Sequence, residues 1–119
     1  MSAYKASLTS EQTRLLKGQL NALNPFHKLL ETMPLQYVTA FLLVAAAPDQ
    51  NVTEYAKRAG TSQSLMSRHL ADIGAVNRHH EEGFGLVELY EDVMDRRNKL
   101  VRLTAKGKGI VREMCEAFK

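Results

Sequence analysis

Residues 52–74 constrain the fold of this chain more than any other segment. Thr53 is placed to cap a helix that contains Ala56, and Gly60 breaks that helix before a second one begins. Ala56 is small enough to let two helices cross closely, and glycine adopts the left-handed conformation that reverses a chain at little cost. A helix, a short turn around glycine and a second helix predict a helix-turn-helix.

The second helix, capped by Thr61 or Ser62, separates an apolar stripe from a polar face. The stripe, which we expect to pack inward, follows the spacing i, i+4, i+7 and consists of Met66, Leu70 and Ile73. The opposite face carries hydroxyl groups, an arginine and small apolar side chains, namely Ser64, Arg68 and Ala71, flanked by Thr61, Leu65, Ser67 and Asp72. Such a face suits the major groove, because arginine pairs with guanine or phosphate and apolar groups meet the thymine methyl. The alternative is a helical hairpin with a merely solvated outer face.

Two β-prone runs follow the helix-turn-helix. Residues 86–90 and 99–103 alternate in character and predict a hairpin whose charged tip is residues 92–98. Residues 81–95 contain six acidic and no basic groups, whereas residues 96–108 contain six basic and no acidic groups. A basic strand with arginines at its tip suits phosphates and a narrow minor groove; the alternative is a hairpin neutralised across its strands. A hairpin directly after a helix-turn-helix predicts a winged helix.

Helices are also predicted on both sides of this unit. Thr9 and Gln12 match a capping box for a helix over Leu8–Leu23, which Pro25 ends or kinks. The helix that begins at Pro34 is apolar over most of its circumference, so we expect it to be central, with the inward residues Leu35, Val38, Phe41, Leu42 and Ala45. After the hairpin, one further helix offers the apolar stripe Ile110, Val111, Met114 and Phe118.

Composition narrows the function classes. The chain has 119 residues, 45% hydrophobic and 24% charged, which predicts one globular domain, and its net charge of +3 is compatible with nucleic acid. The one cysteine, Cys115, excludes an internal disulfide and a cysteine zinc cage, and we expect it to be a buried structural thiol. No signal peptide is evident and no apolar run nears the ~20 residues of a membrane span, so we expect a cytoplasmic protein.

Motifs of catalysis and of cofactor binding are missing from the sequence. It contains no phosphate-binding glycine loop, nucleophile elbow or paired catalytic carboxylates. His79-His80 with Glu81-Glu82 has the composition of metal ligands, but neighbouring residues do not share a helix face, so we expect a polar loop. We expect His69 to be partly buried or near a phosphate. The chain is therefore expected to be no enzyme and to need no metal or cofactor.

Three stretches of the chain form a pattern typical of one protein family. They are Val52–Gly60, Ser62–Leu70 and, above all, Gly85-Leu86-Val87-Glu88 followed by Asp95-Arg96-Arg97-Asn98-Lys99-Leu100-Val101-Arg102-Leu103-Thr104-Ala105-Lys106-Gly107. With these residues the chain resembles MarR-type winged-helix transcriptional regulators over Met33–Gly109. The resemblance implies that Ser62–Ile73 is the recognition helix, that Arg97 is the wing arginine and that Asp95 holds Arg97 by an ion pair. It also implies a dimeric repressor whose terminal helices join the subunits, and it admits a small-molecule effector of unspecified chemistry.

Two features depart from the usual pattern of that family. The passage from Leu70 to Gly85 is lengthened by residues 75–82, so either the recognition helix continues or an extra loop forms. After Thr104, the sequence allows one carboxyl-terminal helix, where the family typically has two.

The predicted fold class is mostly α with a small β-hairpin, a winged helix-turn-helix with terminal dimerisation helices. We expect one domain over residues 1–119. Its parts are N-terminal dimerisation helices at 1–32, the winged helix-turn-helix at 33–104 and a C-terminal helix at 105–119.

The predicted function is sequence-specific binding of double-stranded DNA by a homodimeric regulator, expected to be a repressor. Helix 62–73 would read the major groove and the wing at 91–98 the minor groove. The expected DNA contacts are Ser62, Ser64, Leu65, Ser67, Arg68, Lys57, Arg78, Arg96, Arg97, Lys99 and Arg102. The expected dimer contacts, apolar at helical spacing, are Leu16, Leu20, Leu23, Ile110, Met114 and Phe118. The alternative is a winged-helix protein–protein interaction module without DNA binding, whose apolar terminal helices hold a partner.

Overall fold

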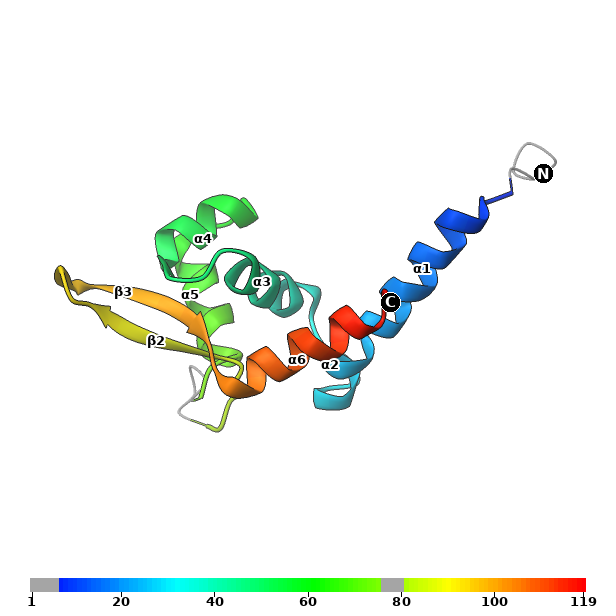
Figure 1. Ribbon diagram of the computed structural model, residues 1–119. Coiled ribbons are helices and arrows are strands. Elements are labelled where there is room, and N and C mark those ends of the chain that lie inside the picture. Colours follow the sequence, from blue (N-terminus) through cyan, green and yellow to red (C-terminus); the bar gives the residue numbers. More distant parts are fainter. Residues whose placement is uncertain (1–6, 76–80) are drawn as a thin grey trace.

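The computed structural model describes residues 7–75 and 81–119. Within these residues, six helices and three strands follow one another in the order α1 (Ser10–Ala22), α2 (Asn24–Leu29), α3 (Leu35–Ala46), β1 (Gln50–Asn51), α4 (Val52–Ala59), α5 (Gln63–Asp72), β2 (Val87–Asp92), β3 (Asp95–Leu103) and α6 (Ala105–Glu116). Figure 1 shows α3, α4 and α5 gathered in the middle, with the β2–β3 hairpin projecting at one end and α1 at the other. The predicted fold class, mostly helical with a small hairpin, is confirmed.

Capping interactions place the two helices of the helix-turn-helix. α4 begins after Asn51, whose Oδ1 accepts the backbone N–H of Glu54 at 2.9 Å. The predicted cap at Thr53 is therefore wrong, because Thr53 already lies in the first helical turn. Gly60 ends α4 in the left-handed conformation, with φ of 70°. Of the two candidates for the cap of α5, Ser62 is the one used: its Oγ accepts the N–H of Leu65 at 3.1 Å.

The capping box predicted for the first helix is present. Thr9 Oγ1 accepts the N–H of Gln12 at 3.0 Å, and Gln12 Oε1 accepts the N–H of Thr9 at 2.9 Å. Pro25 lies in the first turn of α2 and marks the change of direction between the two helices.

The three strands form one antiparallel sheet in the order β1-β3-β2. Val87 pairs with Leu103 and the register runs to Asp92 opposite Asp95, which leaves only Val93 and Met94 in the turn. The predicted tip at residues 92–98 is therefore too long, because residues 95–98 already belong to strand β3, although the register shifts between Glu91 and Asp92 and residues 96–98 have no register partner on β2. Strand β1 has two residues, too few to show as a pattern in the sequence.

The core lies where α3, α4, α5, the sheet and α6 meet. Its buried side chains include Phe26, Val38, Phe41, Val44, Tyr55, Met66, Leu70, Ile73, Leu86, Val87, Val101 and Ile110. Two side chains predicted to face inward from α3 do not: Leu35 is 73% and Leu42 is 41% exposed. The helix is rotated so that Ala40 and Val44 are buried instead, because a helix that is apolar on nearly every side does not specify its buried face.

The terminal helices α1 and α6 pack on each other, and α6 also packs on the core. Ile110, one of the predicted dimer contacts, is only 8% exposed and belongs to the core, so little of its side chain is open to a second subunit. Cys115 is exposed, which corrects its predicted burial. At the crossing of α1 and α6, a Cβ added to Gly18 would lie 2.6 Å from the ring of Phe118. In the part of the chain that the structure describes, no helix is long and apolar enough to cross a membrane.

Candidate nucleic-acid interface

Helix α5 turns its polar face to solvent and its apolar stripe to the core. The predicted inward residues Met66, Leu70 and Ile73 are each 1% exposed. Around them, the exposed residues of α5 are Gln63, Ser64, Leu65, Ser67 and Arg68, while Ala71 is half-buried. The helix therefore presents two hydroxyl groups, an arginine and a leucine on a surface held from behind by three buried side chains.

Asp72, expected to flank the exposed face, is buried. Its Oδ2 accepts a hydrogen bond of 2.6 Å from the hydroxyl of Tyr37 on α3. The Tyr37 ring also lies near His69, with 5.7 Å between ring centroids. Helical spacing could not predict that Asp72 is buried, because its hydrogen-bond partner, Tyr37, lies on another helix 35 residues away in sequence. Its burial removes a carboxylate from the face of α5 and ties the end of that helix to α3.

Helix α5, the predicted recognition helix, ends at Asp72 and so does not continue into the lengthened passage. That passage includes residues 76–80, among them Arg78, His79 and His80, which lie outside the described residues. The predicted phosphate contact by Arg78 therefore stays a prediction.

Ion pairs across the hairpin engage two of the predicted phosphate contacts. Lys99 Nζ lies 3.2 Å from Glu91 Oε1, and Arg102 Nε lies 2.9 Å from Glu88 Oε1. In each pair the two residues are directly opposite in the register of β2 and β3. The guanidinium of Arg102 also lies 4.2 Å from the centroid of the Tyr90 ring. The middle of the hairpin is thus neutralised across its strands.

The arginines at the start of β3 are more open. Arg97 has a side chain that is 95% exposed, with its Nε 3.7 Å from Oδ1 of Asp95. The same carboxylate oxygen accepts the backbone N–H of Arg97 at 3.2 Å. Arg96 is exposed as well, and so is Lys57 on α4. Asp95 therefore lies where the family resemblance places it, beside the arginine of the wing.

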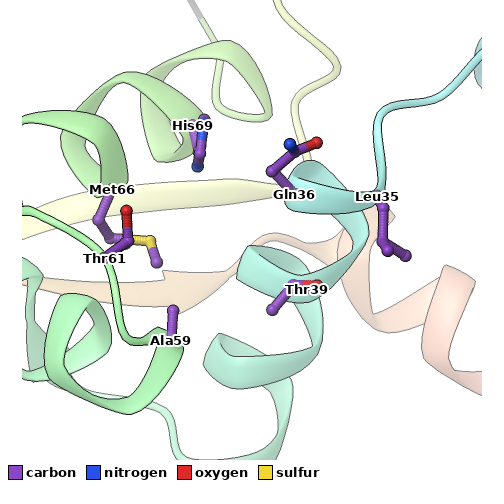
Figure 2. A pocket seen from close by; sticks show the side chains of 7 residues that line it. All are labelled: Leu35, Gln36, Thr39, Ala59, Thr61, Met66 and His69. Atoms are coloured by element: carbon purple, nitrogen blue, oxygen red, sulfur yellow. The ribbon is translucent and has the colours of Figure 1, made fainter.

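Behind α5, a hollow of about 220 Å³ separates this helix from the start of α3. Figure 2 shows Met66 and His69 of α5 opposite the side chains of α3. The lining residues mix apolar and uncharged polar side chains with one histidine: Leu35, Gln36, Thr39, Ala59, Thr61, Met66 and His69. No carboxylate lines this hollow, and across residues 7–75 and 81–119 no three histidine, cysteine or acidic side chains are placed to hold a metal.

A helix-turn-helix followed by an antiparallel hairpin, with a third helix beneath both, is a winged helix. Comparison with solved structures specifies its form: the chain has the fold of the MarR-like transcriptional regulators. A MarR-like regulator from Thermotoga maritima matches with a TM-score of 0.64 and 24% identity, over 94% of this chain and 77% of that one. The fold expected from the resemblance is confirmed.

Two further structures show the same fold. The PcaV transcriptional regulator from Streptomyces coelicolor, in complex with its natural ligand, has a TM-score of 0.57 and 22% identity, over 94% of this chain and 73% of that chain. FabT from Streptococcus pneumoniae, in complex with DNA, has a TM-score of 0.54 and 21% identity; the match covers 68% of this chain and half the length of FabT. No protein-family model matches the sequence, and no curated protein matches it significantly.

Proposed function

We propose that this chain is a MarR-type transcriptional regulator that binds double-stranded DNA as a homodimer and acts as a repressor. The exposed face of α5 carries the proposal. It presents Ser64, Ser67 and Arg68, groups that pair with base edges and phosphates, while the carboxylate of Asp72 is buried and hydrogen-bonded to Tyr37. The likeness to FabT, which was solved with DNA, supports the same assignment.

In this proposal α5 and the wing contact different grooves of the duplex. Helix α5 enters the major groove, with Ser62 and Leu65 at its start near the bases. Arg97 enters the adjacent minor groove, where a narrow A·T-rich stretch attracts an arginine. Lys57 and Arg96 contact phosphates, which position the protein without reading sequence.

The apolar surface of the terminal helices supports the homodimer. Three leucines that face solvent along α1 and its end are 37–67% exposed, namely Leu16, Leu20 and Leu23. An almost wholly apolar groove lies between α3 and α6, lined by Leu42, Ala45, Ala46, Val111, Met114, Cys115 and Phe118. A twofold-related copy would bury the same patches on both subunits. It would also present two recognition helices to half-sites about 34–36 Å apart.

Replacing Arg68 separates base reading from phosphate anchoring. Arg68→Ala should cost about 1–3 kcal/mol on a duplex selected from a random pool, and far less on random DNA, if it pairs with a base. Lys57→Ala should weaken both complexes equally and lower the salt slope by about one. Fluorescence anisotropy over a salt series measures both effects.

Lys28→Ala is the matched control, because Lys28 is exposed on α2 and pairs only weakly with Glu113 at 3.7 Å. It should bind like the parent protein. If Arg68→Ala lowers binding to selected and random DNA alike, Arg68 is a phosphate anchor and the reading residues lie around Ser64 and Ser67. A parent protein that binds no duplex at low salt contradicts the proposal and favours the protein–protein interaction module.

A further inference from the structure

We propose that the turn of the wing, Val93 and Met94, is an apolar contact surface for the minor groove of DNA. The inference rests on the proposed function and adds to it a contact that does not depend on charge. Val93 and Met94 are each 90% exposed, more than any other large apolar side chain of the described residues. Apolar side chains so open in a tight turn contribute nothing to the core, and their exposure to water is unfavourable unless a partner covers them.

The turn is braced from its two sides. Asp92 Oδ1 accepts the backbone N–H of Met94 at 3.0 Å, and Asp92 Oδ2 accepts from the side-chain amide of Asn98 at 3.4 Å. On the other side, Asp95 accepts the backbone N–H of Arg97. These bonds hold the two apolar side chains outward and engage both carboxylates of the turn. Less conformational freedom is then lost on binding.

The charges beside the turn favour DNA as the partner that covers Val93 and Met94. Farther along the hairpin, Lys99 and Arg102 are paired with glutamates on β2. By contrast, the side chain of Arg97, three positions after Met94, is 95% exposed. In Figure 1 the turn is the end of the hairpin that lies farthest from α6, and none of the labelled helices lies beside it. An arginine beside apolar side chains matches the minor groove, which attracts arginine and accepts methionine and other apolar groups against its base steps.

The test compares the salt dependence of two wing variants on one duplex selected from a random pool. The double variant Val93→Ser, Met94→Ser should bind about tenfold or more weakly, because apolar burial is lost. Its slope of log K against log salt should equal that of the parent, because no phosphate contact is lost. Arg96→Ala, which removes a proposed phosphate contact of the wing, should lower that slope by about one. Met94→Leu, with Val93 retained, should restore parent affinity.

Leu89→Ser is the matched control, since Leu89 is 48% exposed on β2 but away from the turn. It should leave DNA affinity unchanged, and circular dichroism should show all variants folded. Parent-like binding by the double variant would overturn the proposal and leave the turn to a protein partner. A loss of binding accompanied by a lower salt slope would overturn it too. If the parent protein binds no duplex, the proposed function itself fails, and that outcome is distinguishable from both.

Discussion

Single ion pairs divide the cations of the hairpin into two groups. Lys99 and Arg102 lie opposite glutamates across the ladder, whereas Arg97 lies near Asp95, two residues before it, and its side chain is 95% exposed. Exposed pairs of this kind contribute about 0–1 kcal/mol each to folding, so stability does not explain them. Their effect is on the local field: they lower the attraction of the middle of the wing for phosphates and leave the start of β3 as its positive part.

Replacing the wing arginine tests the proposed minor-groove contact of a single residue. Arg97→Ala should weaken binding to the selected duplex and reduce the preference for an A·T-rich over a G·C-rich minor groove, because narrow grooves attract arginine. Asp95→Ala should cause a smaller loss, since it frees the arginine without removing it. Competition titrations with the two kinds of duplex measure the preference. Arg112→Ala is the control, because Arg112 is exposed on α6, away from the wing. Binding by Arg97→Ala equal to the parent would show that the wing is assigned wrongly.

At the scale of elements, the first turn of α6 touches the backbone at Leu86, the residue just before β2. A Cβ added to Gly107 would lie 2.2 Å from the carbonyl oxygen of Leu86. Two residues later, a Cβ added to Gly109 meets nothing closer than the guanidinium of Arg112 at 3.8 Å. The same residue type therefore has opposite roles within one helix: one glycine permits contact, and the other only weakens the helix.

This contrast predicts stability changes of opposite sign. Gly107→Ala should destabilise the fold by about 1–3 kcal/mol, because backbone atoms must move to admit the methyl group. Gly109→Ala should stabilise it by up to about 1 kcal/mol through helix propensity. Urea unfolding followed by circular dichroism measures both. Equal effects of the two substitutions would contradict the packing of α6 against Leu86.

Elements with local signals could be predicted from the sequence. The capping box of Thr9, the break at Gly60 and the inward stripe of α5 rest on neighbours within a few residues, and all three are present. Elements that depend on distant partners could not. Strand β1 exists only because β3 pairs with it, and no pattern of two residues indicates it.

The same limit applies to the candidate site. The exposed side chains of α5 follow from helical spacing, so Ser64 and Arg68 were predictable. Burial of Asp72 was not, because it requires Tyr37 from another helix. Likewise, one stripe could not be divided into the core residue Ile110 and the exposed Phe118 without knowing how α6 lies across the sheet.

The whole molecule is elongated. Its radius of gyration is 16.8 Å, whereas a compact domain of this length has about 13–14 Å, and its extents are 58 × 27 × 26 Å. Figure 1 shows the cause, since the hairpin and α1 project in opposite directions from the central helices. A projecting helix with leucines exposed along it has little apolar cover within its own chain, which favours cover by a second copy.

Placing lysines on the apolar surface of α1 tests the homodimer. The double variant Leu16→Lys, Leu20→Lys should be monomeric and lose tight binding to the selected duplex, because the apolar contact and the second recognition helix are lost together. Sedimentation equilibrium beside DNA titration measures both. Leu35→Lys is the control, since Leu35 is 73% exposed but lies on α3. A parent protein that is monomeric where it binds its site tightly would contradict the homodimer.

Asn51 serves two elements at once, as the last residue of β1, paired with Leu100 of the wing, and as the cap of α4. No linker separates β1, which pairs with β3 of the wing, from α4. The hairpin is therefore attached directly to the helix-turn-helix. If α5 and the wing bind DNA as proposed, the distance between their two groove contacts is set when the chain folds, not when it meets DNA. The duplex would then have to adapt its shape, and sequences that resist the required groove geometry would bind more weakly even at base pairs that no side chain touches.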